Sequence, residues 1–101
     1  MAVVKILLVD EDKAFVDATK LYLEKLDQSY NVRTSDTASK AERLLKKTVF
    51  YVIISDYLLP GKNGLTFLSD LRASGNKSIF ILFTGISTEE VIIEALNLGA
   101  D

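Results

Sequence analysis

The sequence predicts an α/β protein in which one parallel sheet lies between two layers of helices, a three-layer, doubly wound arrangement. Three apolar runs rich in branched side chains predict strands at residues 3–9, 49–55 and 78–84, and a weaker alternating run at 30–35 suits an edge strand. Helical patterns separate these runs, so strand and helix alternate four times. Such alternation is typical of a parallel sheet with right-handed crossovers and helices on both faces.

The helical segments are predicted from apolar residues that lie three or four positions apart. In the first segment these residues are Ala14, Phe15, Ala18, Tyr22 and Leu26. Residues 37–47, 64–74 and 88–98 show a similar pattern, and Gly75 and Gly99 follow the last two segments as helix-ending glycines often do.

The three strong strands lack a clean alternation of apolar and polar residues, which indicates strands that are covered on both faces. Their aromatic residues are therefore expected to pack in the core. These residues are Phe50, Tyr51, Phe80 and Phe83.

Composition limits the classes of protein to which this chain belongs. With 101 residues, 49% of them hydrophobic, and a net charge of −2, the chain is expected to form one compact domain. Twelve basic and fourteen acidic residues form no basic block, so direct nucleic-acid binding is not expected. The apolar runs are far shorter than the roughly 20 residues of a membrane span, and no signal-peptide cleavage region follows the first run.

The chain contains no cysteine and no histidine. Disulfides and thiol chemistry are therefore excluded, which is compatible with a reducing cytoplasmic location. The common zinc sites and histidine-based acid and base catalysis are excluded as well. Any metal bound here is expected to be a hard cation with oxygen ligands.

Polar side chains follow three of the predicted strands. The first run ends in "VDED", with Asp10, Glu11 and Asp12, the third ends in "SDYLLP", with Asp56, and the fourth ends in "FTG", with Thr84. Ligands of open parallel sheets bind beyond the carboxyl ends of the strands. Two carboxylates about 4 Å apart repel by roughly 4 kcal/mol at an effective dielectric constant near 20, and Mg²⁺ would offset this repulsion.

Each of these residues also has a simpler structural interpretation. Asp12 opens a predicted helix, and we favour it as the N-cap of that helix over a role as a ligand. Asp10 and Glu11 can be solvated loop acids, and Thr84 can bond to the backbone at the end of its strand. The loop after Asp56 contains residues that are common in turns, namely Pro60, Gly61 and Gly64.

Taken together, "ILLVDED", "VIISDYLLPGKNG" and "ILFTG" resemble, in this order and spacing, the receiver domain of two-component response regulators. The later "ALNLGAD" is similar to the stretch that precedes the fifth strand of these domains. The resemblance covers residues 1–101. It implies a flavodoxin-like fold with strand order 2-1-3-4-5, of which these residues hold 2-1-3-4.

The resemblance implies that Asp56 accepts a phosphoryl group from a sensor histidine kinase or a phosphotransfer protein. It implies that Thr84 hydrogen-bonds the phosphoryl group and acts in the switch. The implied magnesium site consists of Glu11, Asp56 and the backbone carbonyl of Leu58, with Asp10 acting through water. Glu11 stands where many relatives have aspartate.

A receiver of this kind is a cytoplasmic signalling domain of a phosphorelay and not an enzyme that acts on a metabolite. It catalyses only its own phosphorylation and dephosphorylation, and it binds neither nucleic acid nor membrane directly. Phosphorylation switches a protein-interaction surface, and a homodimer through the face of the fourth helix is one arrangement that the resemblance allows. The cognate kinase, the pathway and the output are not identified by these residues.

Two features depart from the family pattern. The residues end at Asp101, before the fifth strand with its lysine and aromatic switch residue and before the fifth helix, so a C-terminally truncated receiver is expected over residues 1–101. If nothing followed residue 101, the strand "IFILF" would be an unprotected edge. Lys62 lies in the loop after Asp56, but its position does not match the lysine of the family.

Two alternatives compete with the receiver interpretation. A phosphatase of the haloacid dehalogenase type would use Asp10 as the nucleophile and Asp12 as the acid, since "VDED" and "ILFT" are similar to its motifs. That alternative leaves "SDYLLPGKNG" unexplained. The other alternative is a receiver-like interaction module that is never phosphorylated.

Overall fold

The chain forms four strands and four helices that alternate along the sequence. The computed structural model describes residues 2–83 and 89–101. The elements are β1 (Val4–Val9), α1 (Lys13–Leu26), β2 (Tyr30–Ser35), α2 (Ala38–Lys47), β3 (Val52–Ser55), α3 (Gly64–Ala73), β4 (Ile79–Leu82) and α4 (Glu89–Asn97). All strand pairs are parallel and the order in the sheet is β2-β1-β3-β4. This confirms the predicted α/β class and the predicted strand order.

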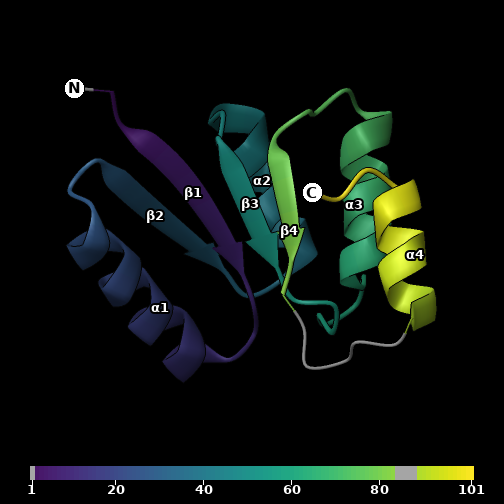
Figure 1. Ribbon diagram of the computed structural model, residues 1–101, viewed down its shortest axis with the longest axis horizontal. Helices are drawn as coiled ribbons and strands as arrows, with labels where there is room; N and C mark the ends of the chain where they lie inside the picture. The colour runs from purple at the N-terminus through teal and green to yellow at the C-terminus, as the bar shows by residue number, and fades with distance from the viewer. Residues whose placement is uncertain (1, 84–88) are drawn as a thin grey trace.

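The helices cover the two faces of the sheet unequally (Figure 1). Helices α2 and α3 pack on one face, which we call the packed face, and α4 lies against α3. Helix α1 packs on the opposite face, the α1 face, over β1 and β2. Because successive side chains of a strand point to opposite faces, Leu7 and Val9 belong to the packed face, and Ile6 and Leu8 to the α1 face.

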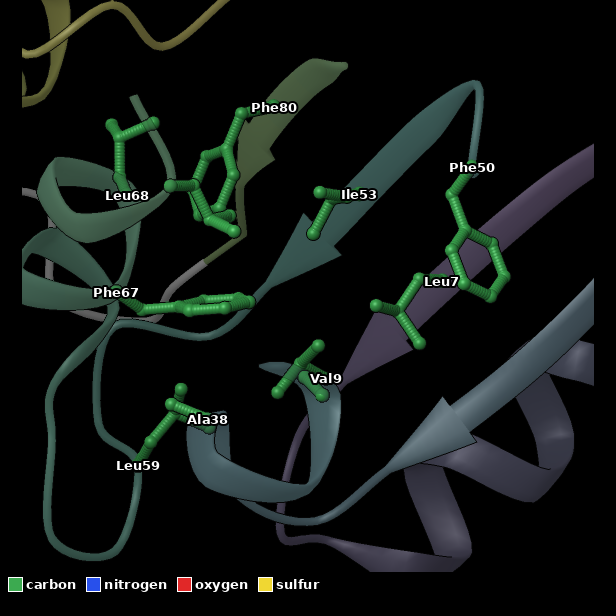
Figure 2. Close-up of a cluster of buried hydrophobic side chains, with 11 residues drawn as sticks. Leu7, Val9, Ala38, Phe50, Ile53, Leu59, Phe67, Leu68 and Phe80 are labelled. Carbon is green, nitrogen blue, oxygen red and sulfur yellow. The ribbon is translucent and has the colours of Figure 1, made fainter. Parts of the chain in front are cut away.

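The packed face contains the larger of the two hydrophobic clusters. Leu7, Ile53 and Phe80 from three strands are completely buried there together with Phe67 of α3. Figure 2 shows these side chains converging between the sheet and the helices. The rings of Phe67 and Phe80 meet edge to face, with centroids 5.8 Å apart, a geometry that aromatic pairs prefer.

The α1 face has a smaller cluster and an open part. The buried members of this cluster are Ile6, Leu8, Val16 and Val32. Toward β4 the cover ends, and the side chains of Ile81 and Phe83 are 41% and 55% exposed. The ring of Phe83 stacks on Phe15 of α1 at a centroid distance of 5.4 Å. This stack is an aromatic contact between α1 and the end of β4.

The structure corrects several predicted details. The strand predicted at 49–55 begins only at Val52, and Val49 before it is 88% exposed. Core packing is confirmed for Phe50 and Phe80, which are buried, and is wrong for Tyr51 and Phe83, which are exposed. In particular, the side chain of Phe83 lies on the α1 face, where the described helices leave the sheet around β4 uncovered.

Helix ends follow the signals that the sequence contains. The side chains of Asp12, Thr37 and Asn63 cap the first three helices, each accepting a hydrogen bond from a backbone N–H of the first turn. Gly75 and Gly99, with φ of 89° and 98°, end α3 and α4 as predicted, because glycine tolerates this left-handed conformation.

Among the described helices, none is both long and apolar enough to cross a membrane.

A carboxylate accepts a hydrogen bond at each edge of the sheet. At the β2 edge, the Val32 N–H donates to Oε2 of Glu24 at 3.0 Å. At the β4 edge, the Phe80 N–H donates to Oδ2 of Asp101 at 3.0 Å, and the Asp101 N–H donates to the Phe80 carbonyl at 2.7 Å. Asp101 thus pairs with one residue of β4, and Figure 1 shows this end of the chain beside the strand.

Candidate functional site

The strand register brings Asp10 and Asp56 to the same edge of the sheet. Val9 and Ser55, the last residues of β1 and β3, are paired with each other. The N–H of Asp56 donates to the carbonyl oxygen of Val9 at 2.9 Å. The N–H of Asp10 donates to the carbonyl oxygen of Ser35 at the end of β2, at 3.0 Å. The two acids predicted to act together are therefore neighbours at the carboxyl ends of the strands.

The electrostatic environment of Asp10 agrees with this placement. Partial burial raises the pKa of the Asp10 carboxyl above its ordinary value, and the negative charges of Asp56 and Asp12 raise it further. The N–H of Asp12 donates to Oδ1 of Asp10 at 2.9 Å and acts in the opposite direction. Asp10 and Asp56 thus lie close enough to repel, and a bound cation would relieve that repulsion.

The side chain of Asp12 caps α1. Its Oδ1 accepts a hydrogen bond from the N–H of Phe15 at 3.1 Å, which is the N-cap geometry at the start of α1. The predicted role as a cap is confirmed. A phosphatase that needs Asp12 as its acid would have to give up this cap.

The other predicted ligands lie at the surface beside the two acids. The side chains of Glu11 and Leu58 are exposed. Within residues 2–83 and 89–101, no three acidic side chains are gathered closely enough to hold a metal ion by themselves. The carbonyl oxygen of Leu58 accepts no hydrogen bond from the described residues. Two neighbouring carboxylates and a free carbonyl fit Mg²⁺, which takes oxygen ligands and usually keeps several waters.

Thr84, the predicted hydroxyl at the end of the fourth strand, lies outside the described residues, and so does Gly85. The described chain reaches Phe83, whose N–H donates to the carbonyl oxygen of Ser55 at 2.9 Å. The role of Thr84 stays a prediction.

Two residues that support the site were missed or undervalued in the sequence. The hydroxyl of Ser55, which is fully buried, donates to the carbonyl of Asp56 at 2.9 Å. The sequence predicts Gly64 as a turn residue, but an added Cβ there would press on the carbonyl oxygen of Asp56 and lie 3.1 Å from the side chain of Leu82. The loop therefore folds back on the start of α3, a contact for which the sequence gives no signal.

Lys62 is already bound to other side chains. Its Nζ lies 3.1 Å from Oε2 of Glu42 and 2.5 Å from Oδ2 of Asp70. The hydrogen bond to Asp70 and then that to Glu42 raise the pKa of Lys62 above its ordinary value. The chain thus uses Lys62 to join its own acids on α2 and α3. That Lys62 does not replace the lysine of the family stays a prediction.

A groove of about 570 Å³ opens beside Asp10 and Glu11, between α1 and α2. Asp10 and Glu11 line one end of it, and Lys40 and Arg43 of α2 line another part. Solvent and small ions therefore reach Asp10 and Glu11 directly.

Comparisons with known proteins identify the family. The family model for the response regulator receiver domain matches residues 6–101. The regulatory protein VanR of Enterococcus faecium is 36% identical over 97 residues, which cover 96% of this chain and 41% of VanR. The alginate biosynthesis transcriptional regulatory protein AlgB of Pseudomonas putida is 32% identical over 96 residues, which cover 95% of this chain and 21% of AlgB. The chain thus spans less than half the length of these relatives.

Solved structures agree with this family and with the predicted fold. A CheY-like response regulator receiver domain protein from Methanospirillum hungatei superposes with a TM-score of 0.90 at 30% identity, covering 99% of this chain and 78% of that one. The chemotaxis protein CheY4 of Vibrio cholerae also gives a TM-score of 0.90, at 26% identity, covering 98% of this chain and 82% of that one. The flavodoxin-like fold is thereby confirmed. The chain belongs to the response regulator receiver domain family of two-component systems.

Proposed function

We propose that this domain is a phosphorylation-controlled switch and that Asp56 is its phosphoacceptor. The observation that carries the proposal is the pairing of Val9 with Ser55, which makes Asp10 and Asp56 neighbours at the carboxyl edge of the sheet. In a receiver domain this edge is the place for ligand chemistry. The partial exposure of Asp56 leaves its carboxylate accessible to a partner protein.

The proposed magnesium ligands are the carboxylates of Glu11 and Asp56 and the carbonyl oxygen of Leu58, with Asp10 acting through water. Bound Mg²⁺ would neutralise charge on the phosphoryl group during transfer. This assignment is supported by the mutual repulsion of Asp10 and Asp56 and by the carbonyl of Leu58, which accepts no hydrogen bond from residues 2–83 and 89–101. Glu11, at the surface next to Asp10, has the reach to approach the same ion by rotation of its side chain.

In the proposed transfer, a carboxylate oxygen of Asp56 forms a bond to phosphorus. The P–N bond of the donor's phosphohistidine breaks at the same time, and its electron pair stays on the imidazole. Because residues 1–101 contain no histidine, the phosphohistidine of the donor lies outside these residues. A sensor histidine kinase or a phosphotransfer protein has the required chemistry. The hydroxyl of Thr84 is proposed to bond to the phosphoryl oxygens.

The proposed output surface is the exposed side of α4. Ile92, Ile93 and Leu96 of this helix are exposed, which suits a surface that binds another protein or a second copy of the domain. Phosphorylation would have to favour one arrangement of this surface by about 5.5 kcal/mol to change its population from 1:99 to 99:1.

The direct test treats the full-length protein with acetyl phosphate and MgCl₂ and measures its intact mass. We expect one phosphoryl adduct that is released by hydroxylamine, as an acyl phosphate should be. Asp56→Asn should form no adduct, and omission of MgCl₂ should slow formation strongly. An adduct that persists in Asp56→Asn would contradict the assignment of Asp56.

The same experiment separates the alternatives. An interaction module that is never phosphorylated gives no adduct even though it is folded, and it shows no magnesium binding that depends on Asp56. A phosphatase would hydrolyse a phosphoester substrate, and Asp10→Asn would abolish that hydrolysis. Membership of the receiver family and the use of Asp12 as a helix cap leave the phosphatase alternative without support.

A further inference from the structure

The loop that carries Asp56 and Leu58 is fixed by an ion-pair cluster at its far end. The ammonium of Lys62 contacts both carboxylate oxygens of Glu42, at 3.2 and 3.1 Å, and Oδ2 of Asp70, at 2.5 Å. Glu42 belongs to α2 and Asp70 to α3. We call these three side chains the Lys62 clamp. It joins the loop to two helices of the packed face.

The rest of the loop shows why such a clamp matters. At its start, the N–H of Asp56 is bonded to Val9, and at its end the N–H of Gly64 donates to the carbonyl of Tyr57 at 2.8 Å. Leu59 is buried in the core cluster of the packed face. Leu58 between these anchors is exposed, and its carbonyl has no hydrogen-bond partner among the described residues. The direction of this carbonyl therefore depends on how firmly the neighbouring residues are held.

Residues 60–62 form the turn that connects the Leu58 segment to the clamp. Gly61 has a φ of 78°, and the N–H of Lys62 donates to the carbonyl of Pro60 at 3.1 Å. Proline restricts the backbone on one side of the turn, and the Lys62 side chain holds the other side. Without the ion pairs of Lys62, the contacts named above that still hold the turn are its backbone hydrogen bonds and the buried side chain of Leu59.

We propose that Lys62 is a positioning residue that orients the Leu58 carbonyl toward the cation site and thereby strengthens magnesium binding. This inference rests on the proposed function, since it concerns the same site. The physical basis is preorganisation: a ligand that is already ordered loses less conformational entropy when the ion binds. Lys62 acts through the loop backbone, because its ammonium is engaged by Glu42 and Asp70.

A role in positioning and a simple electrostatic effect predict opposite changes in magnesium affinity when Lys62 is replaced. Replacing Lys62 by glutamine removes a positive charge from the neighbourhood of a divalent cation, and Coulomb repulsion alone predicts tighter magnesium binding. Loss of positioning predicts weaker binding. Since residues that orient metal ligands typically change affinity by tenfold or more, and this clamp is partly exposed, we expect roughly three- to tenfold weaker binding.

The experiment is a calorimetric titration of the full-length protein with MgCl₂, for wild type, Lys62→Gln and Lys62→Arg. The arginine variant keeps the charge and reaches both acids, so it should restore most of the affinity. Lys40→Gln is the matched control, because Lys40 pairs with Asp36 on the surface at 3.0 Å and removal of its charge leaves the loop untouched. Circular dichroism establishes that each variant is folded at the temperature of the titration.

Two variants of the acids provide a second route if Lys62→Gln does not fold. Glu42→Gln and Asp70→Asn each leave Lys62 one partner, so each should weaken magnesium binding relative to the wild type, by less than the roughly three- to tenfold expected when both ion pairs are lost. If the wild type binds magnesium and Lys62→Gln binds it with equal or higher affinity, the inference is overturned and the proposed function stays intact. Absence of magnesium binding by the wild type would overturn the proposed function and the inference with it.

Discussion

The two faces of the sheet are built from the same strands but differ in cover. On the packed face, Leu7, Ile53 and Phe80 are completely buried beneath α2 and α3. On the α1 face, the buried cluster consists of Ile6 and Leu8 of β1, Val16 of α1 and Val32 of β2, and Ile81 of β4 remains 41% exposed. Hydrophobic burial stabilises in proportion to the apolar area removed from water, so the packed face contributes most of the stability of the described chain.

The difference also bears on the site. The loop that carries Asp56 and Leu58 is attached to the packed face through Leu59, Gly64 and the Lys62 clamp. Asp10 and Asp12 lead into α1, in which one residue, Val16, is buried. One half of the site is therefore attached to the more deeply buried side of the molecule and the other half to the less buried side.

The largest expected effect compares two phenylalanines near the two ends of β4. Phe80→Ala removes a fully buried ring that packs on Phe67, and we expect a loss of about 3–5 kcal/mol in the free energy of unfolding. Phe83→Ala removes a ring that is 55% exposed and contacts Phe15, and we expect a loss of about 1 kcal/mol. Urea unfolding of both variants measures the difference. Equal losses would show that the two faces are equally important for stability.

The next effect concerns crowding on the packed face. Gly64→Ala places a methyl group against the Asp56 carbonyl, and overpacking of this kind costs about 2 kcal/mol. Gly61→Ala is the control, because Gly61 has open space around it and only its φ of 78° opposes a side chain, at about 1 kcal/mol. The backbone amide resonance of Asp56 should shift in Gly64→Ala and stay nearly unchanged in Gly61→Ala. A Gly64→Ala protein with an unshifted Asp56 resonance would contradict the close contact.

A smaller effect compares the caps of α1 and α3. Asp12→Ala and Asn63→Ala each remove one N-cap hydrogen bond, at a cost of about 1 kcal/mol. Helix α3 has five buried residues and α1 has one, so the loss should open α1 more readily. Hydrogen exchange of the amides in the first two turns should therefore accelerate more in Asp12→Ala. A larger acceleration of exchange in α3 of Asn63→Ala than in α1 of Asp12→Ala would contradict the expected difference between the two faces.

The smallest effect is the pH dependence of Asp10. Because the pKa is raised above 3.8 in the folded state, the free energy of unfolding decreases as the pH rises above 3.8, where the carboxyl becomes charged. Asp10→Asn should thus stabilise the magnesium-free protein at pH 7 by about 0.5 kcal/mol, a size typical of surface changes. The gain should disappear as the pH falls toward 3.8. Urea unfolding in EDTA at several pH values measures it, and a gain that persists in acid would contradict this origin.

The sequence was sufficient to predict the order and type of the elements, because apolar periodicity and capping residues act locally. The strand predicted at 30–35 and the roles of Asp12, Gly75 and Gly99 are confirmed by the structure. The same runs could not show which face each aromatic side chain would meet. Phe80 and Phe83 stand in one apolar run, but they point to opposite faces and differ in cover.

The candidate site was predictable where it depends on strand ends and not where it depends on tertiary contacts. Asp10 and Asp56 follow paired strand ends, and parallel strands place such residues together. The Lys62 clamp joins residues that are 20 and 8 positions apart. No periodic pattern connects these positions, so only the packing of α2 beside α3 reveals the cluster.

The contact of Glu24 with the Val32 amide affects how the molecule behaves at high concentration. The unpaired backbone groups of an open strand edge can pair with a strand of another molecule, and aggregates grow by such pairing. A strand of another molecule that paired with β2 here would have to displace the Glu24 carboxylate from the Val32 amide. The displaced carboxylate would then have to be solvated at another position. Helix α1 thus also slows aggregation through the β2 edge. Glu24→Ala should lower the concentration at which the protein begins to aggregate.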